Sequence, residues 1–184
     1  MKSLTDISRY PAGLPLVAEN LLEFHAGRML LLLLKCGAKG RIKGLTKLAK
    51  LDFFVRYPKL FSAASKATGK DPTTASTDTD SAMLRHHYGP WDPRYYQVLS
   101  YLESRDLIAI QPEGKSGFAF SLTPAGTELS KLLSRSATFQ DVCNHMEAVK
   151  RNFGYLSGTA LKRLIYDVFQ NEVAELPLGE TIQS

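Results

Sequence analysis

The first part of the chain alternates dense apolar runs with short polar breaks. Residues 14–34 are rich in Leu, with Val, Phe and Met among them, which predicts a long and increasingly buried helix that ends at Gly37. Residues 41–43 lie between Gly40 and Gly44. Because this interval is too short for a helix, a single short strand is expected there.

A second amphipathic segment follows this strand. Its apolar positions, three residues apart, are Leu45, Leu48, Leu51 and Phe54. Lys47 and Lys50 fall between them, which predicts a helix with one apolar and one basic face. The helix is expected to end near Tyr57, because Pro58 disfavours a helical residue before it. Another short helix is predicted over residues 59–68.

The middle of the chain contains a polar break and then a third helix. Residues 69–81 include no large apolar side chain, which predicts a flexible loop. Asp92 is suited to cap a helix and Pro93 to occupy its first position, so a helix is expected to start here and to run to about Arg105.

Two short apolar runs, residues 107–110 and 118–122, flank a polar segment and predict a β-hairpin. Thr123 and Pro124 are suited to begin the next helix. Helices are then expected over residues 124–133, 139–153 and 157–173. In the last of these, one apolar stripe is suited either to the core, which is the preferred interpretation, or to a docking surface: Leu161, Leu164, Ile165, Val168 and Phe169.

This order predicts a mainly α fold with a small β-hairpin. Helix, short strand, helix, helix, hairpin and helix is the order of a winged helix-turn-helix, with a helix and a loop inserted before its third helix. The predicted parts are an N-terminal tail (1–15), a winged-helix domain (16–135) that contains a flexible loop (69–81), a C-terminal helical extension (136–174) and a tail (175–184).

Composition narrows the class of partner. The 184 residues, 44% of them hydrophobic, suffice for one substantial core, and the net charge of +5 favours an acidic partner such as nucleic acid or an acidic protein surface. Residues 1–15 lack a secretory pattern, and the apolar run 29–34 is far shorter than the ~20 residues of a membrane span. We therefore expect a cytoplasmic protein with no membrane partner. Cys36 and Cys143 lack disulfide or metal-site spacing and are expected to be reduced.

Basic side chains are concentrated in residues 28–59, where Asp52 is the only acid. Such a stretch suits contact with DNA phosphates, although a solvated helix surface gives the same pattern. The candidate nucleic-acid contacts are Lys39, Arg41, Lys43, Lys47, Lys50 and Arg56.

The third helix carries more tyrosine than a groove-reading helix needs, and tyrosine is favoured at protein interfaces. The candidate protein-interface residues in and before it are Tyr88, Trp91, Arg94, Tyr95, Tyr96 and Tyr101. The tip of the hairpin offers Lys115 beside Glu113, which gives little attraction for a phosphate backbone. A protein partner is therefore the preferred interpretation of this helix.

No arrangement of residues suggests catalysis, and no cofactor or metal is expected. His86 and His87 are near carboxylates, but adjacent residues in an extended segment point to opposite faces. Residues 37–44 are glycine-rich but follow a helix and lack the phosphate-loop pattern. An enzyme remains the least favoured hypothesis, resting on the two histidines alone.

Two segments, residues 40–58 (GRIKGLTKLAKLDFFVRYP) and residues 88–96 (YGPWDPRYY), resemble small proteins encoded between their partners in three-component ABC-ATPase systems. These include Lamassu-type bacterial defence operons. The resemblance covers about residues 25–125. Its specific part is KLDFFVRYP, whereas the hairpin exit at residues 121–126 is common to many winged-helix regulators.

The resemblance implies a noncatalytic accessory subunit. Such a subunit docks on an SMC-like ABC ATPase and an effector nuclease in an anti-phage or anti-plasmid complex, and contributes to sensing foreign double-stranded DNA. The alternative that the residues leave open is a winged-helix transcriptional regulator or antitoxin that binds duplex DNA, motivated by the element order and the basic first half.

Overall fold

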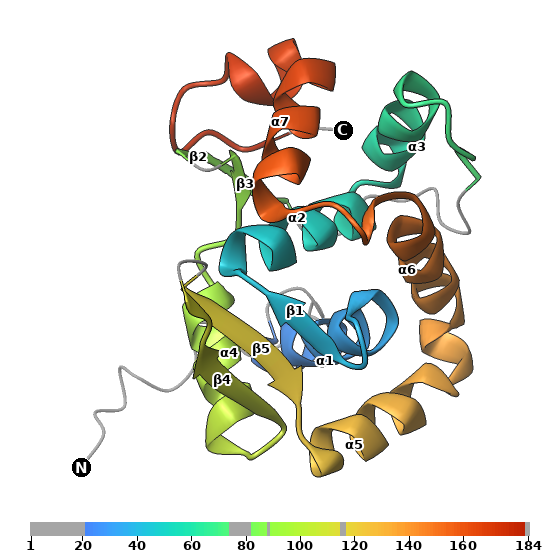
Figure 1. The fold of residues 1–184 in the computed structure, drawn as a ribbon, viewed down its shortest axis with the longest axis vertical. Helices are drawn as coiled ribbons and strands as arrows, with labels where there is room; N and C mark the ends of the chain where they lie inside the picture. Colours follow the sequence, from blue (N-terminus) through green and yellow to red (C-terminus); the bar gives the residue numbers. More distant parts are fainter. Residues whose placement is uncertain (1–20, 74–81, 88, 115–116, 183–184) are drawn as a thin grey trace, which may run out of the picture.

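The computed structural model describes residues 21–73, 82–87, 89–114 and 117–182 (Figure 1). Within them the protein is mainly helical, with two small antiparallel sheets. The part of the expected first helix that precedes residue 21 lies outside these residues, as do residues 74–81 of the expected flexible loop.

Helix α1 (Leu22–Cys36) lies at the centre of the protein (Figure 1). Residues 29–33 are almost fully buried, because neighbours surround the helix instead of covering a single stripe. Helices α4 (Tyr95–Ser104), α5 (Pro124–Ser134) and α6 (Gln140–Phe153) all pack against it. The helix ends before Gly37, as predicted.

A three-stranded antiparallel sheet covers another side of α1. Its strands lie in the order β1 (Arg41–Lys43), β5 (Phe118–Leu122), β4 (Ile108–Pro112). Phe120 lies opposite Ile42 on one neighbour and Ile110 on the other. Phe120 and Ile42 are buried, which fixes the register because a one-residue slip would turn them to the other face. The predicted short strand and hairpin are confirmed.

Local signals also place most of the helix ends. Helix α2 (Leu45–Arg56) ends directly before Tyr57, as the sequence predicts, and α3 (Pro58–Ala67) begins and ends one residue before the predicted range of 59–68. Thr123 caps α5, because its hydroxyl oxygen accepts a hydrogen bond from the backbone N–H of Gly126 at 3.0 Å.

A second small sheet occupies the segment that was expected to be a turn and a helix start. Strands β2 (Leu84–His86) and β3 (Gly89–Trp91) pair antiparallel. Asp92 does accept a hydrogen bond from the backbone N–H of Arg94, but α4 begins only at Tyr95. The sequence did not predict this hairpin, because neither strand has the alternating apolar pattern of a half-buried strand.

The end of the chain pairs with this hairpin. The backbone N–H of Arg85 donates to the carbonyl of Glu180 at 2.8 Å, and that of Ile182 donates to the carbonyl of Met83 at 2.9 Å. Ile182 is buried in the core. The prediction of a tail over residues 175–184 is therefore wrong for residues 179–182, since backbone pairing, which side-chain patterns do not report, holds them in place.

The C-terminal helices complete the same core. Helix α6 packs against α1 and α2, and α7 (Gly158–Val168) packs against α2 and α3. A 3₁₀ turn (Ala137–Phe139) precedes α6, and a π-helical turn (Gln170–Ala174) follows α7. One apolar cluster extends from Ala26 to Ile182 and includes Leu161, Ile165 and Phe169, so the predicted core stripe of α7 is confirmed.

Two further findings concern the cysteines and the lengths of the helices. Cys36 and Cys143 are both buried free thiols, as predicted. In the described part of the chain, every helix is too short or too polar to cross a membrane.

Candidate functional site

The predicted basic surface divides into two groups in the structure. Lys39 and Lys43 are exposed, and Arg41 and Lys47 are half-buried at the surface. Lys50 and Arg56 are fully buried, so the prediction that they contact nucleic acid is wrong. Helix α2 lies between β3, α6 and α7. Within this packing Lys50 contacts Pro90 of β3, and Arg56 contacts Asp92.

Lys50 holds the second sheet against α2. Its side-chain amine donates a hydrogen bond to the carbonyl of Pro90 at 2.8 Å. Burial lowers the pKa of Lys50 to about 7, with smaller contributions from the positive charges of Lys162 and Arg85. The amine of Lys50 therefore contributes to packing inside the protein.

Arg56 belongs to a buried network of charged side chains. Its guanidinium donates to the carboxylate of Asp92 at 2.8 Å and lies 3.5 Å from that of Asp52. Asp52 also accepts hydrogen bonds from Arg28 at 3.1 Å and from the hydroxyl of Tyr95 at 2.7 Å. The network joins α1, α2 and α4, because each of these helices contributes at least one of its members.

Tyr95 is only 2% exposed, so its prediction as an interface residue is wrong. Arg94 is half-buried and donates from its side chain to Asp92 at 2.9 Å, while another of its nitrogens lies 2.6 Å from Nε2 of His25. Burial acts to raise the pKa of Asp92, but the hydrogen bonds from Arg94 and the charge of Arg56 hold that pKa well below its ordinary value.

An aromatic surface remains near the start of α4. We define the aromatic patch as His86, Trp91 and Tyr96. The ring of Trp91 lies 5.5 Å from that of His86 and 5.9 Å from that of Tyr96, measured between centroids. Tyr96 is 65% exposed, which makes it one of the most exposed large hydrophobic side chains of the described residues. Tyr101 is half-buried beneath Arg105, and Tyr88 lies outside the described residues.

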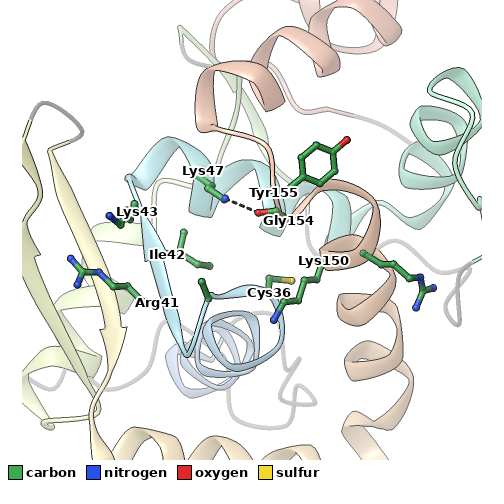
Figure 2. A pocket seen from close by; sticks show the side chains of 10 residues that line it. Cys36, Arg41, Ile42, Lys43, Lys47, Lys150, Gly154 and Tyr155 are labelled. Atoms are coloured by element: carbon green, nitrogen blue, oxygen red, sulfur yellow. Dashed lines mark hydrogen bonds between the residues drawn. The ribbon is translucent and has the colours of Figure 1, made fainter.

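A basic trough lies where β1, the start of α2 and the α6–α7 turn meet (Figure 2). We define it by the side chains of Arg41, Lys43, Lys47, Lys150, Arg151 and Tyr155. Its main hollow has a volume of about 570 Å³. A second hollow of about 500 Å³ shares Lys43, Lys47 and Tyr155 with the first and extends to the start of α7. Asp and Glu are absent from the described residues that line either hollow.

Hydrogen bonds fix several of these cations in place. The amine of Lys47 donates to the carbonyl of Gly154 at 2.7 Å, and that of Lys150 donates to the carbonyl of Gly37 at 3.0 Å. At the rim, Glu113 forms ion pairs with Arg41 and with Lys43, and these interactions, led by the hydrogen bond from Lys43, lower the pKa of Glu113. The trough thus brings Arg41, Lys43 and Lys47 together as the sequence suggested.

The sequence pattern did not indicate the half of the trough that comes from α6 and the turn after it. Lys150 and Arg151 form a basic pair at the end of α6, a position that also suits the helix dipole and so gave no distinct signal. Only the packing of α6 against α1 and α2 brings them to β1. Lys39 is close in sequence to this region but does not line either hollow.

The histidines and cysteines offer little chemistry. The rings of His86 and His87 lie 5.5 Å apart, and the residues described contain no group of three His, Cys, Asp or Glu side chains placed to hold a metal. Burial raises the pKa of the Cys36 thiol to about 12, which keeps it from acting as a thiolate nucleophile near neutral pH.

Comparison with known proteins does not extend this description. No protein-family model, no curated protein and no solved structure matches the chain.

Proposed function

We propose that this chain is a noncatalytic accessory subunit, built on a winged helix-turn-helix, that docks through its aromatic patch on a protein partner. In this proposal α1, β1, α2, α4, β4 and β5 form the winged helix, and α3 with the β2–β3 hairpin is the insertion. The partner is an SMC-like ABC ATPase that acts with an effector nuclease in a cytoplasmic defence complex against phages or plasmids.

The exposed side of α4 is the observation that carries the proposal. In a DNA-reading winged helix this helix enters the major groove and contacts bases and phosphates. Here α4 contains neither Lys nor Arg, and it exposes Tyr96 beside Trp91. Exposed aromatic side chains with restricted rotamers are typical of the centre of a protein interface.

The buried network supports the same proposal in a second way. The segments on which the resemblance rests contribute Asp52, Arg56, Asp92, Arg94 and Tyr95 to it. These residues hold α4 and the β2–β3 hairpin rigidly against α2. A rigid platform loses little conformational entropy when a partner binds, which favours affinity.

The alternative function, a transcriptional regulator or antitoxin that binds duplex DNA, receives less support. The outward residues of α4 include Gln97 and Ser100, which suit base edges, but Glu103 is also exposed and repels phosphates. At the hairpin, Glu113 pairs with Arg41 and Lys43 and so reduces the positive charge that a DNA-contacting wing requires.

Co-expression with the adjacent genes tests the proposal. A tagged chain is expected to co-purify with the neighbouring ATPase, and Tyr96→Glu is expected to abolish this, because it places a charge at the most exposed ring of the aromatic patch. Leu132→Glu is the matched control, since Leu132 is 66% exposed on α5, outside the patch. Failure of the unchanged chain to retain the ATPase, or equal loss with both variants, contradicts the proposal.

A further inference from the structure

The basic trough concentrates positive charge in a concave part of the surface. Five of the ten residues that line its main hollow are Lys or Arg: Arg41, Lys43, Lys47, Lys150 and Arg151. Glu113 neutralises part of the charge at the rim but is not among the lining residues. Like charges held together in a concavity repel one another and focus a positive potential, so an anion that enters relieves the repulsion.

Two of the cations are held in place before any ligand arrives. Lys47 and Lys150 are each anchored to a backbone carbonyl, and an ammonium group that makes one such bond keeps further N–H donors for a ligand. Figure 2 shows Lys47 and its bond to Gly154 beside Tyr155. Burial lowers the pKa of Lys47, which is the direction expected where a charge is partly removed from water without a compensating anion.

Two helix starts add to this potential in the second hollow. Gly44 and Thr46 come from the start of α2, and Ser157, Gly158 and Thr159 from the start of α7. A Cβ added at Gly158 would lie 2.9 Å from the backbone nitrogen of Lys47, which shows how closely the two helix starts approach. The positive ends of both helix dipoles therefore lie beside Lys43 and Lys47.

Tyr155 adds an aromatic ring to the basic trough. It lines both hollows and is 69% exposed, and the ammonium of Lys70 lies 4.4 Å from the centre of its ring. An exposed aromatic ring beside a row of cations is the arrangement with which proteins bind a nucleotide, since the ring stacks on the base while the cations contact the phosphates.

We propose that the basic trough binds a phosphorylated nucleotide unit, with Arg41, Lys43, Lys47, Lys150 and Arg151 at the phosphates and Tyr155 on the base. A hollow of about 570 Å³ has the size of a small-ligand pocket. The unit is either a free nucleotide or part of an exposed single strand, because a duplex stacks its bases inside and cannot offer one to Tyr155. This inference is independent of the proposed docking function.

Fluorescence anisotropy with a labelled oligothymidylate of about 12 nucleotides tests the proposal. The test variant is Lys43→Gln with Arg151→Gln, since both side chains are exposed. The matched control, Lys59→Gln with Lys66→Gln, removes the same charge from exposed positions on α3. At about 0.1 M salt, loss of two phosphate contacts is expected to weaken binding roughly 25-fold, while the control changes it little.

Two further arms identify the source of the nucleotide and the role of the ring. Displacement of the oligonucleotide by ATP assigns the trough to free nucleotides, whereas displacement only by unlabelled single strand assigns it to nucleic acid. Tyr155→Leu is expected to weaken binding by about fivefold or more.

Three results would overturn the proposal. They are no binding of either ligand, equal weakening by the trough and control variants, and equal affinity for a duplex of the same length with no effect of Tyr155→Leu. None of them bears on retention of the ATPase, so failure of this inference is distinguishable from failure of the docking proposal.

Discussion

Lys50 makes the stability of the protein depend on pH in a direction that follows from its burial. In the unfolded chain the amine has its ordinary pKa of 10.5, whereas burial lowers the pKa to about 7 in the folded protein. Between these two values the unfolded chain binds a proton that the folded protein does not. The free energy of unfolding therefore rises with pH in this window, and the contribution of Lys50 is lost as the pH falls through 7.

The size of the effect follows from the two pKa values. Integrating the difference in bound protons from pH 7 to pH 9 gives a gain of about 2 kcal/mol in the free energy of unfolding. Lys50→Met keeps most of the apolar stem and removes the titrating amine, so it is expected to lack this gain. Because other groups titrate in the same range, the informative quantity is the difference between the unchanged chain and the variant.

Urea unfolding at pH 7, 8 and 9 measures that difference. The free energy of unfolding of Lys50→Met, minus that of the unchanged chain, is expected to be larger at pH 7 than at pH 9. Lys66→Met, at an exposed position on α3, is the control and is expected to follow the unchanged chain. Parallel pH profiles for the unchanged chain and Lys50→Met would refute the assignment of a buried, readily deprotonated amine.

Three other substitutions test the packing, each by urea unfolding. Asp52→Asn is expected to cost about 3–5 kcal/mol, because it removes the negative charge that faces buried guanidinium groups, and a cost below about 1 kcal/mol would contradict the network. Gly158→Ala is expected to destabilise the protein, since its Cβ would lie 2.9 Å from the backbone nitrogen of Lys47, and unchanged stability would contradict this close approach. Thr123→Ala is expected to cost about 1 kcal/mol through loss of the cap on Gly126, whereas Thr123→Ser should retain it.

The parts of the fold that depend on local chemistry could be predicted from the sequence. The strand at residues 41–43 lies between two glycines, both of which have positive φ. Pro58 ends α2, and Thr123 caps α5, as their side chains dictate. Each of these signals acts within a few residues, so the sequence pattern was enough to locate the end of the helix or strand concerned.

The burial of the charged residues of α2 could not be predicted in the same way. Lys50 and Arg56 occupy positions of α2 that a helical pattern assigns to solvent, yet both are fully buried, Lys50 against β3 and Arg56 against Asp92. Arg56 is tolerated in the interior because two carboxylates face it: Asp52, one turn earlier in α2, and Asp92, which is distant in sequence. Burial of a polar face by elements far along the chain leaves no periodic signal.

Packing between distant parts of the chain also explains why the sequence did not predict the whole basic trough. The trough needs Lys150, Arg151 and Tyr155, which lie more than a hundred residues after β1. The pairing of Arg85 with Glu180 likewise depends on backbone groups that any sequence carries. Long-range packing, and not local propensity, decides both features.

Binding of the purified chain to the SMC-like ATPase that the proposal expects to be encoded beside it tests the central claim most directly. Isothermal titration calorimetry is expected to show a complex that Tyr96→Glu weakens at least about 10-fold and that Leu132→Glu leaves unchanged. Absence of binding by the unchanged chain, or unimpaired binding by Tyr96→Glu, would contradict the claim that this protein acts by docking through its aromatic patch.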